Sequence, residues 1–231
     1  PQTLEDFARV DRFYFGTNPY LDQRVNFQTF KGQHVLEVGC GAGSAACRFA
    51  LAGAQVTAVD ITHEAVQLTR VHAEMSGVAA AVTVLQSDAE KLDGLADQSF
   101  DYLYSWGVMH HSSAPESCFR QAARVLKPGG KGLIMVYHKS SLRYWLKGTI
   151  WLLIKGKLFS GSNYESVQRF YTDGYYHKHY TRQGFAAALV EAGLKVTAVD
   201  VTHMSSRMVP WIPDRLREWL KARVGWLLVA H

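Results

Sequence analysis

The chain has 231 residues, of which 48% are hydrophobic and 19% charged, and its formal net charge is +5. This composition excludes a disordered chain, and the length allows one large domain with a substantial core. The longest apolar run near the middle, Ile150–Ile154, is far too short to span a bilayer. Three cysteines are too few for a disulfide framework, and no secretory signal pattern opens the chain. We therefore expect a single domain over residues 1–231 in the reducing cytoplasm.

Residues 35–43, with the sequence VLEVGCGAG, predict a buried strand that runs into a glycine turn. Aliphatic and β-branched residues fill the first half, as in a strand covered on both faces. The three glycines that allow a tight turn and a close approach to a ligand are Gly39, Gly41 and Gly43. A helix begins at Ser44, and helix N-termini favour anionic ligands. We interpret Cys40 as a small residue at this close approach rather than as a nucleophile.

Strands and helices alternate from the glycine turn to residue 138. We expect strands at 55–59, 82–85, 100–104 and 132–137, and helices at 44–52, 62–76 and 115–126, with a turn at 127–130. The alternation is typical of an α/β fold with a doubly wound, mostly parallel sheet. After residue 180 we expect a helix at 181–192, a strand at 194–201 and a final antiparallel strand at 226–230.

Chemically suited residues follow the ends of the first three strands. The carboxylate of Asp60, after the second strand, can accept hydrogen bonds from both hydroxyls of a ribose. Asp88, after the third strand, can accept from an adenine amino group, and the backbone N–H of Ala89 can reach a ring nitrogen. Ile61 offers an apolar face to a purine, and Glu37 just before the glycine turn can organise the other end of the ligand. The pattern predicts an adenosine-containing ligand.

At this point the chain resembles the class I S-adenosylmethionine-dependent methyltransferases. The shared motifs lie within about residues 32–136 and follow that family's order and spacing: VLEVGCGAG, VTAVD, SDAEKL, FDYLYSWGVMHH and VLKPGG. The resemblance implies a seven-stranded sheet of order 3-2-1-4-5-7-6, with S-adenosylmethionine as cofactor and S-adenosylhomocysteine as product. It implies cofactor contacts at Gly39, Gly41, Asp60, Ile61, Asp88, Ala89 and Ser105. To this set we add Glu37, Cys40, Gly43 and Trp106, which lie in the same motifs.

Two other cofactor classes fit the sequence less well. A nicotinamide dehydrogenase fingerprint needs G-x-G-x-x-G, and Ser44 stands at its last position. A metal is not expected either, because His177 and His179 have no accompanying set of carboxylates and cysteines. We interpret that histidine pair as an exposed basic patch. The acidic ligand that metal-dependent catechol methyltransferases place after the fourth strand is replaced here by Ser105-Trp106-Gly107.

Methyl transfer from a sulfonium needs alignment and exclusion of water, and a hydroxyl or ammonium acceptor also needs a base. The candidates for that base are His110, with His111 beside it, and His138, since each follows the end of a strand. The alternatives are packing around the cofactor for His110 and a surface position for His138. Tyr14 and Tyr20 of the lead-in, residues 1–32, can close over the methionyl end or serve in packing.

An inserted segment, residues 139–180, carries 10 of the 28 aromatic residues. It also holds seven Lys or Arg residues against two acidic ones, so it accounts for the whole net charge. An insertion after the fifth strand is placed to roof an acceptor pocket, and aromatic walls suit a flat or greasy substrate. The mixture of Trp, Leu and Ile with Arg and Lys over 141–158 also allows peripheral membrane contact. Contact between subunits is a further alternative, and nucleic acid is not expected.

The sequence thus predicts methyl transfer from S-adenosylmethionine to an oxygen or nitrogen atom of an aromatic or apolar small molecule in specialised metabolism, by a monomer or homodimer. Two alternatives stay open. One is a lipid or quinone methyltransferase that works at the membrane surface. The other is a non-catalytic regulatory protein that binds S-adenosylmethionine.

Overall fold

The structure is a computed structural model that describes residues 1, 3–19, 21–154, 159, 161–164, 166–167, 177–202, 213–225 and 227–231. The chain divides into two compact units. The first comprises Pro1–Trp106 and Gln121–Leu133, and the second comprises Gly107–Arg120 and Ile134–His231. No helix in the described part of the chain is long and apolar enough to cross a membrane.

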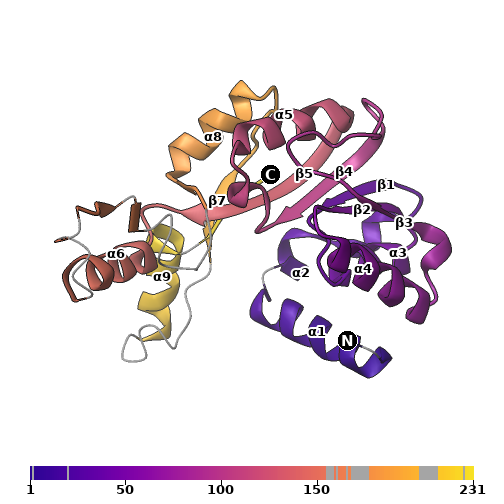
Figure 1. Cartoon of the computed structure of the whole chain (residues 1–231), viewed down its shortest axis with the longest axis horizontal. Coiled ribbons are helices and arrows are strands. Elements are labelled where there is room, and N and C mark those ends of the chain that lie inside the picture. The colour runs from indigo at the N-terminus through magenta and orange to yellow at the C-terminus, as the bar shows by residue number, and fades with distance from the viewer. Residues whose placement is uncertain are drawn as a thin grey trace. The chain divides into compact units, whose positions relative to one another are not determined.

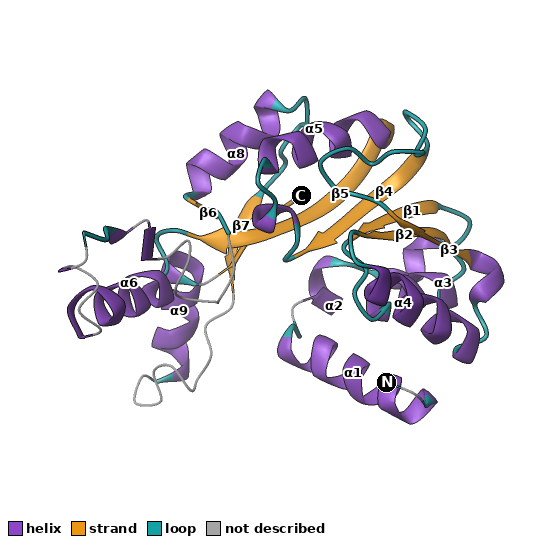
Figure 2. Cartoon of the chain, viewed as in Figure 1, coloured by secondary structure: helices purple, strands orange, loops and turns teal. Residues whose placement is uncertain are grey.

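The strands form one mixed sheet of order β3-β2-β1-β4-β5-β8-β7. Figure 2 draws the strands in orange. Their bounds are His34–Val38 for β1, Gln55–Asp60 for β2, Val82–Gln86 for β3, Phe100–Trp106 for β4, Leu126–His138 for β5, His179–Tyr180 for β6, Val199–Thr202 for β7 and Leu227–Ala230 for β8. Strand β1 pairs in parallel with β2 and β4, whereas β8 is antiparallel to β5 and β7. The expected order is confirmed, because the short β6, which pairs with β5 off this path, accounts for the different numbering.

The α-helices for which the structure gives bounds are Leu4–Thr17 for α1, Leu21–Arg24 for α2, Ser44–Leu51 for α3, His63–Met75 for α4, Pro115–Val125 for α5, Leu142–Thr149 for α6, Arg182–Glu191 for α8 and Asp214–Val224 for α9. A π-helix, η4, continues from α6 over Ile150–Ile154, and the 3₁₀ helix η3 covers Met109–His111. Threonines cap three of the α-helices: Thr3 precedes α1, Thr62 precedes α4 and Thr181 precedes α8. Each hydroxyl accepts a hydrogen bond from an N–H group of the first turn, which explains where these helices begin.

Two element boundaries differ from the sequence prediction. Strand β5 begins at Leu126, so the turn expected at 127–130 lies inside the strand. A Cβ at Gly130 would lie 3.1 Å from the Phe100 carbonyl oxygen, and glycine therefore lets the chain run close to the start of β4. Strand β7 begins at Val199 rather than at residue 194. Its partner β8 is four residues long, and the pairing begins where Val199 meets Ala230.

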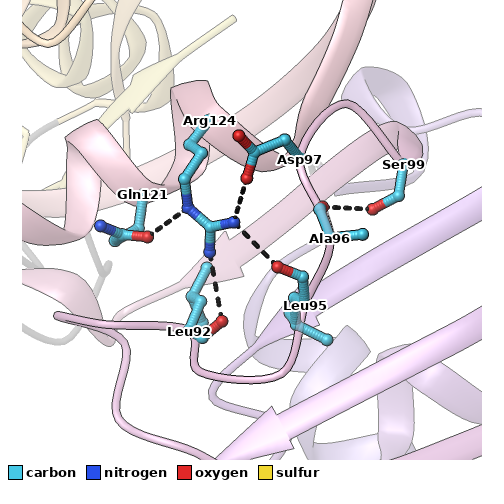
Figure 3. A network of polar contacts seen from close by, with 7 residues as sticks. All are labelled: Leu92, Leu95, Ala96, Asp97, Ser99, Gln121 and Arg124. Carbon is cyan, nitrogen blue, oxygen red and sulfur yellow. Dashed lines mark hydrogen bonds and ion pairs between the residues drawn. The ribbon is translucent and has the colours of Figure 1, made fainter.

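In the first unit, the connection between β3 and β4 is fixed by Arg124 of α5 (Figure 3). Its guanidinium donates to the carbonyl oxygens of Leu92 and Leu95 at 3.2 and 2.8 Å and to Asp97 Oδ1 at 2.6 Å. Gln121 accepts a further bond from Nε at 2.6 Å. Because the guanidinium is planar and has five donors, it holds this loop at several points at once.

The first helix belongs to the first unit, where it lies against α3 and α4 (Figure 1). Phe7 is the fully buried residue of α1. The guanidinium of Arg48 on α3 stands 4.1 Å from the ring centroid of Phe15, a cation–π contact between the two helices. The aromatic lead-in of the sequence therefore packs on the helices that follow the glycine turn.

Candidate active site

The glycine turn after β1 has the backbone conformation that its sequence predicts. Gly41 and Gly43 have φ angles of +54° and +81°, which residues other than glycine rarely adopt. A Cβ at Gly43 would also lie 3.1 Å from Thr69 of α4. The N–H groups of Gly39 and Cys40 donate to the carbonyl oxygen of Val59 at 2.8 and 3.1 Å, which ties the loop to β2.

The carboxylate of Asp60, at the end of β2, already accepts hydrogen bonds from nearby groups of the chain. Oδ2 accepts from the N–H of Gly41 at 3.1 Å, and Oδ1 accepts from the N–H and hydroxyl of Thr62, both at 3.0 Å. A carboxylate has about four lone-pair positions. Asp60 can therefore accept about one further hydrogen bond without releasing one of these, and a second ribose hydroxyl would have to share or replace a present donor.

Glu37 is a buried acid whose Oε2 atom has no hydrogen-bond partner in the described chain. Burial raises the pKa of this carboxyl to about 8, and the nearby charge of Asp60 adds to the effect. A buried carboxyl with an unused oxygen is costly unless something pairs with it. A ligand that brings a positive charge or a donor to the end of β1 would satisfy it.

The end of β2 presents an apolar side chain, Ile61, and the end of β3 carries a second buried atom without a partner. Ile61 has 63% of its surface exposed. Asp88 accepts from the N–H of Glu90 at 2.9 Å through Oδ1. The hydroxyl oxygen of Ser87 is buried and has no partner in the described chain. Sequence reasoning missed Ser87, although it precedes Asp88-Ala89 directly and the strand end was the available signal.

Three further predicted contacts have structural roles in this unit. Cys40 is buried and burial raises the pKa of its thiol to about 12, which agrees with its interpretation as a small residue rather than a nucleophile. The Ser105 hydroxyl donates to the carbonyl oxygen of Val38 at 3.2 Å and so joins β4 to β1. The Trp106 ring lies parallel to that of Tyr104, with centroids 6.4 Å apart.

Tyr14 of α1 reaches β4. Its hydroxyl shares a hydrogen bond of 2.6 Å with the hydroxyl of Tyr104, which is fully buried. Burial raises the pKa of both phenols well above the ordinary value, so both stay protonated at neutral pH. Tyr14 is therefore not a base at neutral pH, and either hydroxyl can donate in the hydrogen bond with Tyr104. Tyr20, the other lead-in candidate, lies outside the described residues.

In the second unit, His110 of η3 lies in a cluster of aromatic rings and imidazoles. Its ring centroid is 4.1 Å from those of His111 and Tyr137. His177 and His179 belong to the same cluster, with ring centroids 5.4 and 5.5 Å from that of Tyr137. The interpretation of this pair as an exposed patch is wrong, because His177 is buried. In the fold, the His177 ring packs edge-on against the ring of Tyr137.

His110 is fully buried, and neither ring nitrogen makes a hydrogen bond of ordinary geometry within the described chain. Burial lowers the pKa of His110 well below the ordinary value, and the three neighbouring histidines lower it further, against a smaller opposing effect of the Met135 backbone. The imidazole is therefore neutral at physiological pH, and one nitrogen is able to accept a proton.

The other histidine candidate, His138, is also buried in the second unit. Its Nδ1 lies 2.8 Å from the carbonyl oxygen of Gly225, so the N–H is on Nδ1 and donates there. Burial lowers the pKa of His138, and the Gly225 contact partly offsets that effect. Among the described residues, no group of three or more His, Cys, Asp or Glu side chains has the arrangement of a metal site.

The insertion ends in a polar anchor in the same unit. Lys178 forms a 2.6 Å ion pair with Glu116 of α5, and the Tyr180 hydroxyl donates to the same oxygen at 3.0 Å. The Lys178 N–H donates to the carbonyl oxygen of His110 at 2.8 Å. The anchor therefore joins the end of the insertion to η3, which carries the candidate base.

The first unit fits S-adenosylmethionine on its own observations. It combines a glycine turn with positive φ angles, an unpaired buried oxygen of Glu37 and an exposed Ile61. These features lie at the carboxyl ends of neighbouring parallel strands, where ligands of open α/β sheets bind.

Residues 36–134 match a family described as a methyltransferase domain. A ubiquinone biosynthesis O-methyltransferase from Xanthomonas oryzae pv. oryzae is 35% identical over 127 residues, which cover 55% of this chain and 51% of that protein. One from Idiomarina loihiensis is 33% identical over 122 residues, covering 52% of this chain and 48% of that protein. The chain thus spans about half the length of the curated relatives it matches.

The fold is shared more widely than the sequence. An S-adenosylmethionine dependent methyltransferase from Mesorhizobium loti superposes with a TM-score of 0.60 at 20% identity, over 87% of this chain and 91% of that one. The strand order and the glycine turn with positive φ angles agree with the fold that the resemblance to class I S-adenosylmethionine-dependent methyltransferases implies. The match to the methyltransferase-domain family covers residues 36–134, which is less than half of the chain.

Proposed function

We propose that the protein transfers a methyl group from S-adenosylmethionine to an oxygen or nitrogen atom of an aromatic or apolar small molecule. The observation that carries this proposal is the pair of acids at adjacent strand ends, Glu37 and Asp60, on either side of the glycine turn. One is buried with an unused oxygen, and the other already holds the loop in place. The two carboxyl groups suit a ligand with a cationic end and a ribose.

The residues that would hold the cofactor belong to three strand ends. Asp60 would accept from the ribose, Ile61 would cover the adenine, and Asp88 with the Ala89 N–H would bind its polar edge. Glu37 and the backbone of Gly41 would face the methionyl part. When bound, the cofactor supplies an electrophilic methyl group on a sulfonium whose positive charge disappears on transfer. The protein would then orient the acceptor atom toward the methyl group and exclude water from the active site.

His110 is our candidate for the proton acceptor. It is neutral and buried, and neither ring nitrogen makes a hydrogen bond of ordinary geometry within the described residues. A hydroxyl or ammonium acceptor must lose a proton before or during transfer, and a neutral imidazole can take it. His138 is the weaker candidate because Nδ1 is committed to Gly225 and only Nε2 is left. Tyr14 would act as a donor that orients a bound group.

Oxygen is the better supported acceptor atom, because both relatives named above are O-methyltransferases by name. The insertion, residues 139–180, is our proposed wall of the acceptor pocket. Its anchor, Lys178 with Glu116, joins it to the segment that carries His110. We propose a role in specialised metabolism.

The experiment that tests the proposal is transfer from methyl-labelled S-adenosylmethionine to a metabolite extract, with catechols and hydroxyquinones as defined acceptors. A labelled small molecule identifies the acceptor class. Cofactor binding without a labelled product in any extract would instead support the non-catalytic regulatory protein. Failure to bind S-adenosylhomocysteine at all would overturn the proposal.

One observation favours the second candidate, a quinone or lipid methyltransferase at the membrane surface. Helix α6 and η4 expose a run of large apolar side chains, with Trp145, Leu153 and Ile154 exposed by 53%, 60% and 75%. The sequence of residues 141–158 also mixes basic with apolar residues, a composition that suits an anionic surface. The curated relatives are named for ubiquinone biosynthesis, and a long-chain quinone resides in the membrane.

Co-sedimentation with phosphatidylglycerol vesicles separates the two candidates. Binding that is lost in the triple variant Trp145→Ser, Leu153→Ser and Ile154→Ser favours the surface enzyme. The matched control is Leu216→Ser with Trp219→Ser, which removes two exposed apolar residues of α9. Equal sedimentation of all three proteins with vesicles would argue against this surface.

A further inference from the structure

His72 of α4 is a buried side chain for which neither the fold nor the proposed chemistry accounts. It lies in the first unit and has only 2% of its surface exposed. Its Nδ1 lies 2.8 Å from the carbonyl oxygen of Ala42, which is in the glycine turn. Its Nε2 lies 3.5 Å from Asp11 Oδ2, which is on the lead-in helix α1. The ring stacks on Phe7 of α1, with centroids 4.3 Å apart.

Helix α4 touches the glycine turn at a second point, one turn of helix earlier. The Thr69 hydroxyl donates to the carbonyl oxygen of Gly41 at 3.2 Å. The same residue fills the space beside Gly43. Because residues three apart lie on one face of a helix, Thr69 and His72 present a pair of donors to the two successive carbonyl groups. The N–H of Gly41 is meanwhile held by Asp60. The path of the turn is thus fixed from both sides.

Both partners of the His72 ring are hydrogen-bond acceptors. A neutral imidazole has one N–H group and can serve only one of them, whereas an imidazolium donates from both nitrogens. The titratable groups that face the ring are Asp11 from α1 and Cys47 from α3, and the glycine turn contributes the Ala42 carbonyl. Burial acts to lower the pKa of His72, but its interactions with Asp11, Cys47 and Ala42 outweigh burial and raise it to about 10.

We propose that His72 is a positioning residue that links the docking of α1 to the conformation of the glycine turn, so that α1 docking and cofactor binding strengthen each other. This inference rests on the proposed function, since it takes the glycine turn to be the cofactor loop. When α1 undocks, the buried His72 ring loses its contact with the Asp11 carboxylate. Without that carboxylate the ring is less readily protonated, so the hydrogen bond from its Nδ1–H to the Ala42 carbonyl is no longer strengthened by a positive charge. Coupling between two binding events is reciprocal, so a bound cofactor must also hold α1 in place.

Asp11→Asn and His72→Asn test the two halves of this link. Asp11→Asn removes the charge but keeps the shape, and His72→Asn places an amide nitrogen where Nδ1 stands while losing the contact with Asp11. Glu5→Gln is the matched control, because it removes one negative charge from the exposed first turn of the same helix. Each protein is measured by calorimetric titration with S-adenosylhomocysteine and by hydrogen exchange of residues 4–17, with and without that ligand.

We expect Asp11→Asn and His72→Asn each to weaken S-adenosylhomocysteine binding about fivefold or more. They should also speed exchange in α1 without ligand, and the double variant should resemble the single ones. Glu5→Gln should behave like the wild type. Unchanged exchange and unchanged affinity in Asp11→Asn would overturn this inference while leaving the proposed function intact. A wild-type protein that does not bind S-adenosylhomocysteine would overturn both.

A measurement on the wild type covers the case in which the variants do not fold. Nitrogen-15 chemical shifts report whether the His72 ring carries one proton or two. At pH 7.5 both nitrogens should be protonated, and α1 protection, corrected for the intrinsic exchange rate, should fall as the pH rises from about 7 toward 10. A singly protonated His72 ring at pH 7.5 would overturn the proposed link between α1 docking and the glycine turn.

Discussion

Tyr14 and Tyr104 share a hydrogen bond of 2.6 Å between their phenolic oxygens, which joins the lead-in helix α1 to strand β4. Tyr104 also stands opposite Glu37 in the parallel register of β4 and β1. The charge of Glu37 contributes to the raised pKa of both phenols. A helix at the start of the chain thus reaches the strand end where we place the methionyl part of the cofactor.

This pair leads to a prediction about non-additive stability. Tyr14→Phe leaves the buried Tyr104 hydroxyl without its partner, which should lower the free energy of unfolding by about 1–3 kcal/mol. Tyr104→Phe should have a similar effect through Tyr14. The double variant should be no less stable than the worse single variant, because no orphaned hydroxyl is left. Urea unfolding of the four proteins measures this cycle, and strictly additive losses would contradict the hydrogen bond.

Asp60→Ala should weaken the binding of S-adenosylhomocysteine by about 1.5–3 kcal/mol, because charge-assisted hydrogen bonds to the ribose are lost. That loss corresponds to about a ten- to hundredfold rise in Kd. The same substitution releases the N–H of Gly41, so part of the loss would come from the loop rather than the ribose. Titration with S-adenosylhomocysteine and with its 2′-deoxy analogue separates the ribose contribution from the loop contribution. The affinity for the analogue should fall less on substitution, because the analogue lacks one of the ribose hydroxyls. Equal affinities of variant and wild type would refute the ribose assignment.

Glu37 should make cofactor binding depend on pH. Its pKa of about 8 means that the carboxyl is largely protonated at pH 7 before the cofactor binds. A cationic ligand favours the carboxylate, so binding should release up to about one proton at pH 7 and strengthen as the pH rises toward 8. Calorimetry in buffers of different ionisation enthalpy counts that proton. No proton release would contradict the assignment.

The same group should also shape the stability curve without ligand. Because the folded pKa of Glu37 is raised, its contribution to stability is complete below about pH 4.5 and is lost as the pH rises through about 8. Glu37→Gln should remove this decline, and it should also abolish the proton release on cofactor binding. A variant whose unfolding free energy falls over this range as the wild type's does would show that another group titrates.

The sequence predicted the glycine turn and the strands beside it well because their signals are local. Within ten residues the sequence has a strand, three glycines and the start of a helix. This pattern indicates a tight turn, and the positive φ angles of Gly41 and Gly43 agree with it. The order of the strands came from the resemblance, since local patterns do not say which strands become neighbours. The relatives support the fold and the methyltransferase domain, but the roles of the individual site residues stay predictions.

The missed features depend on contacts between distant parts of the chain. His72 and Asp11 are 61 positions apart, and nothing near either residue reveals the other. From the sequence, His177 was interpreted as part of an exposed basic patch. In the structure its ring packs against that of Tyr137. Helix α9 was not predicted, and part of the insertion lies outside the described residues. Burial and pairing of titratable side chains are properties of the folded chain, and sequence periodicity alone does not contain them.

Substitution of His110 tests the chemical step itself. If His110 accepts the acceptor's proton, His110→Gln should lower kcat by about 10²–10⁴-fold, while the affinity for S-adenosylhomocysteine stays near that of the wild type. Because the pKa of His110 lies well below its ordinary value, wild-type activity should stay level as the pH falls from 7.5 to 6.5 and decline only at lower pH. His138→Asn tests the weaker candidate base in the same assay, since an amide can still donate to the Gly225 carbonyl. A His110→Gln enzyme that keeps both kcat and the pH profile would show that His110 packs the site rather than moves the proton.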